Sequence, residues 1–320
     1  MRSFWLIGST FIGLCSTVMM LLALAKPAHA ATAPASARAA TPFSAQLGSS
    51  LQLPTLSFAI VGACRPPFED DVAGYPSAVQ SQIWKDVAAA NPAFAVTTGD
   101  YLFAAPTKTP STVGTQIGLF LTAQSNYKGN VYHAMGGMEC DGAATDNCGV
   151  AGTSGGITPN YQGFISQLAP SGQTLPYYVL NFHGPGNAWT AKFVVVAANA
   201  WSTAQATWLG NTLAVPTTYT FIVCNAPTTE TTAPCWAAKG STNLGTIIAQ
   251  YPYTLFIAGH THTYEYLASS KEVIVGNGGA PLSGIIDYGY VIAKLQSNKS
   301  ITFTAYDYST NAVQGTFTVQ

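Results

Sequence analysis

Short apolar runs alternate with segments of spaced apolar residues along the first half of the chain. The apolar runs at residues 56–61, 94–97 and 130–135 end at glycine or polar residues, which predicts buried strands. The segments 75–90 and 112–123 between them carry apolar residues at helical spacing. Successive strand and helix units form parallel sheets with right-handed crossovers, so this pattern predicts an α/β fold.

The second half of the chain continues with both kinds of segment. Further strands are expected at residues 177–182, 192–197, 218–224 and 253–258. Further helices are expected near residues 161–168, 204–213 and 243–251. Four closing segments alternate apolar and polar residues between polar turns, at 271–275, 288–295, 300–306 and 314–319. This alternation is typical of antiparallel strands.

The first 50 residues differ in composition from the rest. Residues 1–30 contain an early cation, a long apolar stretch and the sequence Ala28-His29-Ala30, which is typical of a cleaved signal peptide. An uncleaved membrane anchor is the alternative, because the apolar stretch is long enough to span a bilayer. Residues 31–50 are rich in Ala, Ser, Thr and Pro, which predicts a linker before a domain at 51–320. We therefore expect a secreted or periplasmic protein without membrane attachment after cleavage.

Charged residues make up only 8% of the chain and hydrophobic residues 48%, which predicts a globular protein with a large core. Removing the signal peptide would take away two of the 12 cations and none of the 13 acids. The mature chain would be mildly acidic and has no cluster of Lys or Arg to neutralise phosphates. A nucleic-acid partner is therefore not expected.

Export permits disulfide bonds between the five cysteines of the mature chain. The short spacings favour Cys140 with Cys148 and Cys224 with Cys235, which leaves Cys64 unpaired. The alternative is a different pairing among Cys64, Cys140 and Cys224, because each of them follows a predicted strand.

A His-x-His pattern follows the apolar run at 253–258. Gly259 ends the predicted strand, so His260 and His262 stand at its carboxyl end, where α/β sheets bind ligands. Residues i and i+2 of an extended backbone point the same way, so both imidazoles are placed to face one metal ion. The alternative is that the histidines only form hydrogen bonds that cap the strand.

The order of polar landmarks after the predicted strands is similar to a known family. Gly62, Gly99-Asp100, Gly136, Asn225 and Gly259-His260-x-His262 resemble the five motif positions of the calcineurin-like metallophosphoesterases, on the purple acid phosphatase side. The resemblance implies a sandwich of two mixed β-sheets flanked by helices. It also implies a two-metal site at the strand ends that hydrolyses phosphate esters.

Three family metal ligands carry over to this chain. Asp100 matches the bridging carboxylate, and His260 with His262 matches the two histidines of the last motif. One carboxylate and two imidazoles suit a single divalent cation such as zinc, iron or manganese. From the resemblance we expect one cation at most.

The other motif positions depart from the family. Ala63-Cys64-Arg65 stands where the family has Asp-x-His, Gly136-Gly137-Met138-Glu139 where it has Gly-Asn-His and an acid, and Asn225 where it has a histidine. We take Arg65 as a candidate phosphate contact, because its guanidinium forms a bidentate fork. Glu139 is a candidate acid or base, and Asn225 a further candidate catalytic residue.

Two functions follow from this set of residues. The first is a secreted hydrolase that acts on small phosphate esters through a reduced metal site. The second is a catalytically inactive pseudophosphatase that serves as a binding module for a ligand or an unknown protein.

Overall fold

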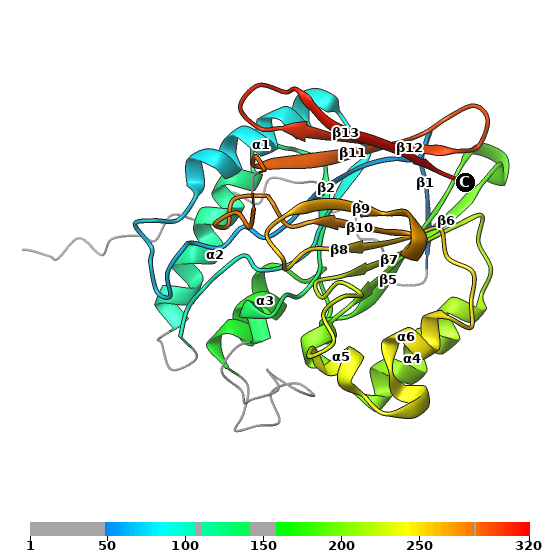
Figure 1. The fold of residues 1–320 in the computed structure, drawn as a ribbon, viewed down its shortest axis with the longest axis horizontal. Helices are drawn as coiled ribbons and strands as arrows, with labels where there is room; N and C mark the ends of the chain where they lie inside the picture. Colours follow the sequence, from blue (N-terminus) through cyan, green and yellow to red (C-terminus); the bar gives the residue numbers. More distant parts are fainter. Residues whose placement is uncertain (1–48, 106–109, 141–157, 285) are drawn as a thin grey trace, which may run out of the picture. The chain divides into compact units, whose positions relative to one another are not determined.

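The computed structural model describes residues 49–105, 110–140, 158–284 and 286–320 (Figure 1). The expected signal peptide and nearly all of the expected linker lie outside these ranges. The described residues belong to one compact unit. Among the described residues, none of the helices has the length and apolar character needed to span a bilayer.

One sheet has six strands in the order β13-β12-β11-β2-β3-β4 (Figure 1). Its strands are β2 (Ser57–Val61), β3 (Phe94–Thr97), β4 (Asn130–His133), β11 (Gly289–Leu295), β12 (Ile301–Asp307) and β13 (Val313–Val319). Strands β2, β3 and β4 are parallel, as the alternation of strand and helix predicts. Strands β11 to β13 add to β2 in antiparallel fashion, so the prediction for the last three strands is also confirmed.

The other sheet has seven strands in the order β1-β5-β6-β7-β8-β10-β9. Its strands are β1 (Ser50–Gln52), β5 (Tyr178–His183), β6 (Thr190–Val196), β7 (Tyr219–Cys224), β8 (Leu255–Ala258), β9 (Tyr264–Leu267) and β10 (Glu272–Val275). The antiparallel pairing expected for 271–275 is found on one side of β10, where it pairs with β9. On its other side β10 pairs in parallel with β8, because the chain first turns through β9 and returns between the two. Both sheets are mixed.

Helices cover the outer face of each sheet (Figure 1). The helices on the six-stranded sheet are α1 (Ser77–Ala90), α2 (Pro110–Gln124) and α3 (Pro159–Gln167). The helices on the seven-stranded sheet are α4 (Thr203–Ala214), α5 (Pro234–Ala237) and α6 (Leu244–Ile248). The described chain therefore forms four layers, in the order helices, sheet, sheet, helices.

The core between the two sheets is rich in phenylalanine. Phe58 of β2 makes edge contacts with Phe193 and Phe221 of the facing sheet, at centroid distances of 4.9 and 5.2 Å. The alternate residues of β2, Ala59 and Val61, pack under the helices. Both faces of β2 are thus covered, which is why its sequence is a continuous apolar run and not an alternating one.

The described cysteines differ from the expected pairing. Cys64, Cys224 and Cys235 are buried free thiols, so the predicted bridge between Cys224 and Cys235 is wrong. Burial raises the pKa of Cys235 well above its ordinary value, with the adjacent Cys224 acting in the same direction. Disulfide formation starts from a thiolate, which this dry site disfavours. Cys148 lies outside the described residues, so its pairing with Cys140 stays a prediction.

Candidate functional site

The ends of β2, β3 and β8 approach one another around Thr98. A Cβ atom at Gly62 or Gly259 would overlap the Thr98 hydroxyl, so only glycine fits at these two positions. The hydroxyl of Thr98 donates to the carbonyl of Val275, at 3.0 Å. The landmark glycines of the sequence are therefore required by the close packing of the strand ends.

The loop after β2 runs alongside the loop after β3. Ala63 N donates to Gly99 O at 3.2 Å, and Cys64 N donates to Asp100 O at 2.9 Å. These two backbone bonds bring Arg65, the next residue, to the edge of the sheet that also carries Asp100.

Four residues of this edge have left-handed backbones although none is glycine. Their φ angles are 51° at Ala63, 61° at Asp100, 69° at His260 and 56° at His262. Such conformations cost about 1–3 kcal/mol each and persist only when the surrounding structure holds them. The backbone that turns Asp100, His260 and His262 at the strand ends is therefore imposed by the packing around it.

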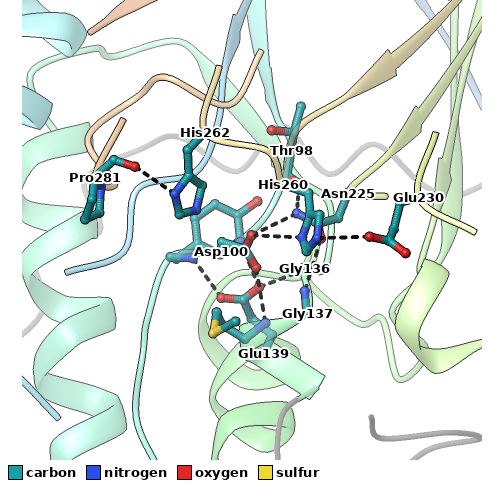
Figure 2. A network of polar contacts seen from close by, with 12 residues as sticks. Thr98, Asp100, Gly136, Gly137, Glu139, Asn225, Glu230, His260, His262 and Pro281 are labelled. Atoms are coloured by element: carbon teal, nitrogen blue, oxygen red, sulfur yellow. Dashed lines mark hydrogen bonds and ion pairs between the residues drawn. The ribbon is translucent and has the colours of Figure 1, made fainter. Parts of the chain in front are cut away.

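Asp100 is fully buried, and protein donors engage both of its carboxylate oxygens (Figure 2). Oδ1 accepts from Met138 N at 3.1 Å, and Oδ2 accepts from Asn225 Nδ2 at 3.2 Å. Asn225 also donates to Thr98 O at 2.8 Å and accepts from Gly137 N at 3.2 Å. Asn225 thus holds three loops together, and its catalytic role stays a prediction.

Glu139 lies below Asp100 and is also fully buried (Figure 2). Its Oε2 accepts from Asp100 N at 3.0 Å and from Gly136 N at 2.8 Å, while Oε1 accepts from Tyr101 N at 2.8 Å. Burial raises the pKa of Glu139, and the nearby charge of Asp100 raises it further. Both oxygens face backbone donors inside the protein, which supports a structural role, and the acid or base role stays a prediction. Glu139 joins the ends of β3 and β4.

His260 lies between two carboxylates (Figure 2). Its Nδ1 is 4.0 Å from Asp100 Oδ2, and its Nε2 is 3.7 Å from Glu230 Oε2. Sequence reasoning missed Glu230, which lies in the loop after β7 where no periodic pattern marks it. The only sequence signal for Glu230 is that it is an acid shortly after the strand end that carries Asn225.

His262 turns towards the loop after β10 (Figure 2). Its Nδ1 is 2.8 Å from Pro281 O, so this nitrogen carries the proton and donates to the carbonyl. Burial lowers the pKa of His262, and the charge of Arg65 lowers it further. The imidazole is therefore neutral around pH 7, with Nε2 as its remaining acceptor.

In this structure the expected ligands are more widely spaced than the ligands of a bound zinc ion. Two ligand atoms of a tetrahedral zinc ion lie about 3.4 Å apart, whereas Asp100 Oδ2 and His260 Nδ1 are separated by 4.0 Å. The Asp100 oxygens are also engaged by N–H donors. Within the described ranges, no three His, Cys, Asp or Glu side chains gather closely enough to hold a metal ion. Asp100, His260 and His262 lie at one edge, and their role as metal ligands stays a prediction.

Arg65 is a half-buried cation beside this edge. Its guanidinium lies 4.7 Å from the ring centroid of Phe103, and Nη1 donates to Pro66 O at 3.1 Å. Burial lowers the pKa of Arg65, while the charge of Asp100 opposes that change. Nε is buried and has no hydrogen-bond partner, and Arg65 forms no ion pair with any described carboxylate. Arg65 thus brings a positive charge that is only partly satisfied by the protein.

Two facing mixed sheets with outer helices, and polar loops at the strand ends, define the fold of the calcineurin-like metallophosphoesterases. Among solved structures, a purple acid phosphatase from yellow lupin, PPD1, is similar with a TM-score of 0.59 and 16% identity. That match covers 85% of this chain and 54% of the lupin chain, so this chain spans about half the length of the lupin enzyme.

Two further structures have the same fold. GAP50, the anchor in the inner membrane complex of Plasmodium, matches with a TM-score of 0.55 and 12% identity, over 83% of this chain and 89% of its own. A dimetal phosphatase from Danio rerio matches with a TM-score of 0.51 and 12% identity, over 83% of this chain and 99% of its own. No protein-family model and no curated protein sequence matches this chain. At these identities the comparisons establish the fold.

Proposed function

We infer that this chain is an exported, catalytically silent protein with the metallophosphoesterase fold, and that it binds a tetrahedral oxyanion at the strand-end edge without a metal. The observation that carries this proposal is the closed network of Asp100, Asn225 and the backbone of 137–138. The apolar stretch and Ala28-His29-Ala30 support export.

Metal-assisted hydrolysis needs bound cations that lower the pKa of a water molecule and clamp the phosphoryl oxygens. Ala63, Gly137 and Met138 offer no ligand side chain for a hard cation at positions where the family has Asp, Asn and His. Each carboxylate oxygen of Asp100 already accepts one protein hydrogen bond, which competes with a cation for its lone pairs. The residues of this edge therefore lack the means to generate a hydroxide nucleophile in the family's way.

Arg65 supports the binding of an oxyanion. Its guanidinium has five donors in a planar fork, and only one described hydrogen bond, to Pro66 O, uses them. Guanidinium groups bind phosphate and carboxylate through two parallel bonds. Stacking on Phe103 fixes the plane of the fork, which reduces the entropy lost on binding.

The second candidate function is a hydrolase that acts on phosphate esters through one cation. It is favoured by the 4.0 Å approach of His260 to Asp100, which a small rotation of the imidazole would shorten to a shared-ligand distance. Under this alternative, Asp100, His260 and His262 all become essential for turnover.

The test uses the exported protein purified after dialysis against zinc, manganese and ferrous salts in turn. Elemental analysis measures bound metal, p-nitrophenyl phosphate measures turnover, and calorimetry measures binding of inorganic phosphate. We expect substoichiometric metal, no turnover above buffer, and phosphate binding that Arg65→Gln weakens about tenfold or more. Lys239→Gln, which removes an exposed cation elsewhere, should leave phosphate binding unchanged.

Each part of the proposal has its own contradicting result. Stoichiometric metal together with turnover that Asp100→Asn abolishes would establish the hydrolase. This result would overturn the proposal that the protein is catalytically inactive. Phosphate binding that is absent, or equal in Arg65→Gln and wild type, would overturn the oxyanion site.

A further inference from the structure

A cleft separate from the strand-end edge lies between α4 and the outer face of β5. Along β5 the side chains of Tyr178, Leu180 and Phe182 are buried towards the facing sheet, while Val179 and Asn181 alternate to the outer side and are half-buried. Only the three-residue strand β1 lies beyond β5 in this sheet. Because Val179 and Asn181 are only half-buried, the outer face of β5 is covered incompletely.

The other wall of the cleft is one stripe of α4 and the loop that follows it. Ala204, Trp208, Asn211, Thr212 and Val215 line the cavity together with residues of β5 and β6. Ala204, Trp208 and Asn211 are spaced by four and three residues, so they lie along a single side of the helix. The cavity has a volume of about 570 Å³, within the range of small-molecule sites.

The cleft carries no available charge. Its one ionisable lining residue is Lys192, whose side chain is almost fully buried. Lys192 Nζ donates to the carbonyls of Thr212 at 2.7 Å and Leu213 at 3.4 Å, and also to that of Val215. The ammonium group therefore caps the carboxyl end of α4, and the cleft does not select for phosphate, nucleotides or other anions.

An indole and two carboxamides line this neutral cleft. Trp208 is half-buried and packs at 4.8 Å against Tyr177, which holds the indole in place. Asn181 comes from β5 and Asn211 from α4. Neither side chain makes a hydrogen bond to any described residue. Each carboxamide both donates and accepts hydrogen bonds, so the two side chains suit ligand hydroxyl groups, which also donate and accept.

We propose that the cleft between α4 and β5 binds a neutral sugar. A pyranose ring has an apolar C–H face that packs on an aromatic ring, and hydroxyl groups at its rim that donate to and accept from carboxamides. Trp208 supplies the aromatic ring, and Asn181 and Asn211 supply the polar partners. The aliphatic stem of Lys192 and the side chain of Val179 add apolar lining. None of these residues belongs to the strand-end edge, so the proposal does not depend on the oxyanion site.

The test measures binding of maltohexaose, cellohexaose and N-acetylchitohexaose to the exported protein by calorimetry. At least one of these neutral oligosaccharides should bind, and Trp208→Ala should weaken that binding at least tenfold, with folding checked by circular dichroism. Asn211→Ala changes an exposed residue and should weaken binding about three- to tenfold. Gln250→Ala, which removes an exposed carboxamide outside the cleft, should bind like the wild type.

Three outcomes would overturn the proposal. One is the absence of binding for all three oligosaccharides. Another is binding that neither Trp208→Ala nor Asn211→Ala changes. The third is concentration-dependent self-association that Trp208→Ala abolishes while sugars have no effect, which would make a second copy of this chain the occupant of the cleft.

Discussion

Replacing Glu139 by alanine tests whether this carboxylate is structural or catalytic. In the wild type, three buried backbone N–H groups, those of Asp100, Tyr101 and Gly136, have Glu139 as their acceptor. Each buried donor left without a partner costs about 1–3 kcal/mol. Water that enters the vacated space offsets part of this loss, so we expect Glu139→Ala to lower the free energy of unfolding by about 3–5 kcal/mol.

Glu139→Gln gives a graded comparison with almost the same side-chain volume. A carboxamide oxygen at the Oε2 position keeps the bonds from Asp100 N and Gly136 N, while its NH₂ group meets the N–H of Tyr101. One donor is then unpaired, and we expect a loss of about 1–3 kcal/mol. Glu265→Ala is the control, because Glu265 is exposed on β9 and its removal should change stability by about 0.5 kcal/mol at most.

Urea unfolding followed by tryptophan fluorescence measures these free energies at fixed pH. The expected order of stability is wild type and Glu265→Ala, then Glu139→Gln, then Glu139→Ala. If Glu139→Ala unfolds within about 0.5 kcal/mol of wild type, the reasoning is refuted. A carboxylate that the fold does not need would then again be a candidate acid or base.

Three further predictions concern buried polar groups. Burial lowers the pKa of His133 to about 4, so the unfolded chain binds the proton first as pH falls from about 6.5 to 4. This group should cost roughly 3 kcal/mol of stability over that window, measured by urea unfolding as the difference between the pH profiles of wild type and His133→Gln. Lys192→Met leaves the carbonyls at the end of α4 without their donor, and calorimetric unfolding should show a loss of about 1–3 kcal/mol. Alkylation in denaturant without reductant should label both Cys224 and Cys235, as mass spectrometry of their peptides will show; an unlabelled pair would contradict the free thiols.

The sequence predicts the strands well wherever burial on both faces produces a continuous apolar run. The run at 94–97 coincides with β3, because its residues face the aromatic core on one side and the helices on the other. The sequence predicts less well which strands pair with each other. Strand β10 pairs with β8 and β9 and not with β11 to β13. The choice of partner strands depends on contacts between distant segments, which the period-two pattern of 271–275 does not specify.

At the site, the sequence predicts which residues meet but not how they bond. Asp100, Asn225 and His260 share one edge because each follows the carboxyl end of a strand. Whether Glu139 faces solvent or the interior depends on unpaired N–H groups at the ends of β3 and β4, and these appear only when the loops are placed. Glu230 was missed because its distance from His260 results from the fold of an irregular loop.

The hydrogen bonds of Asn225 help to hold the strand-end loops in shape. A buried carboxylate needs a compensating positive charge or several donors, and Asp100 has donors from Asn225 and from Met138 N. A carboxamide also accepts, so Asn225 satisfies Gly137 N, which a metal-bound histidine would not do. The left-handed backbone at Asp100 is held by the same network, together with the bond from Asp100 N to Glu139. The fold of this edge is therefore stable on its own donors and acceptors, which leaves Arg65 as the cation available to a ligand.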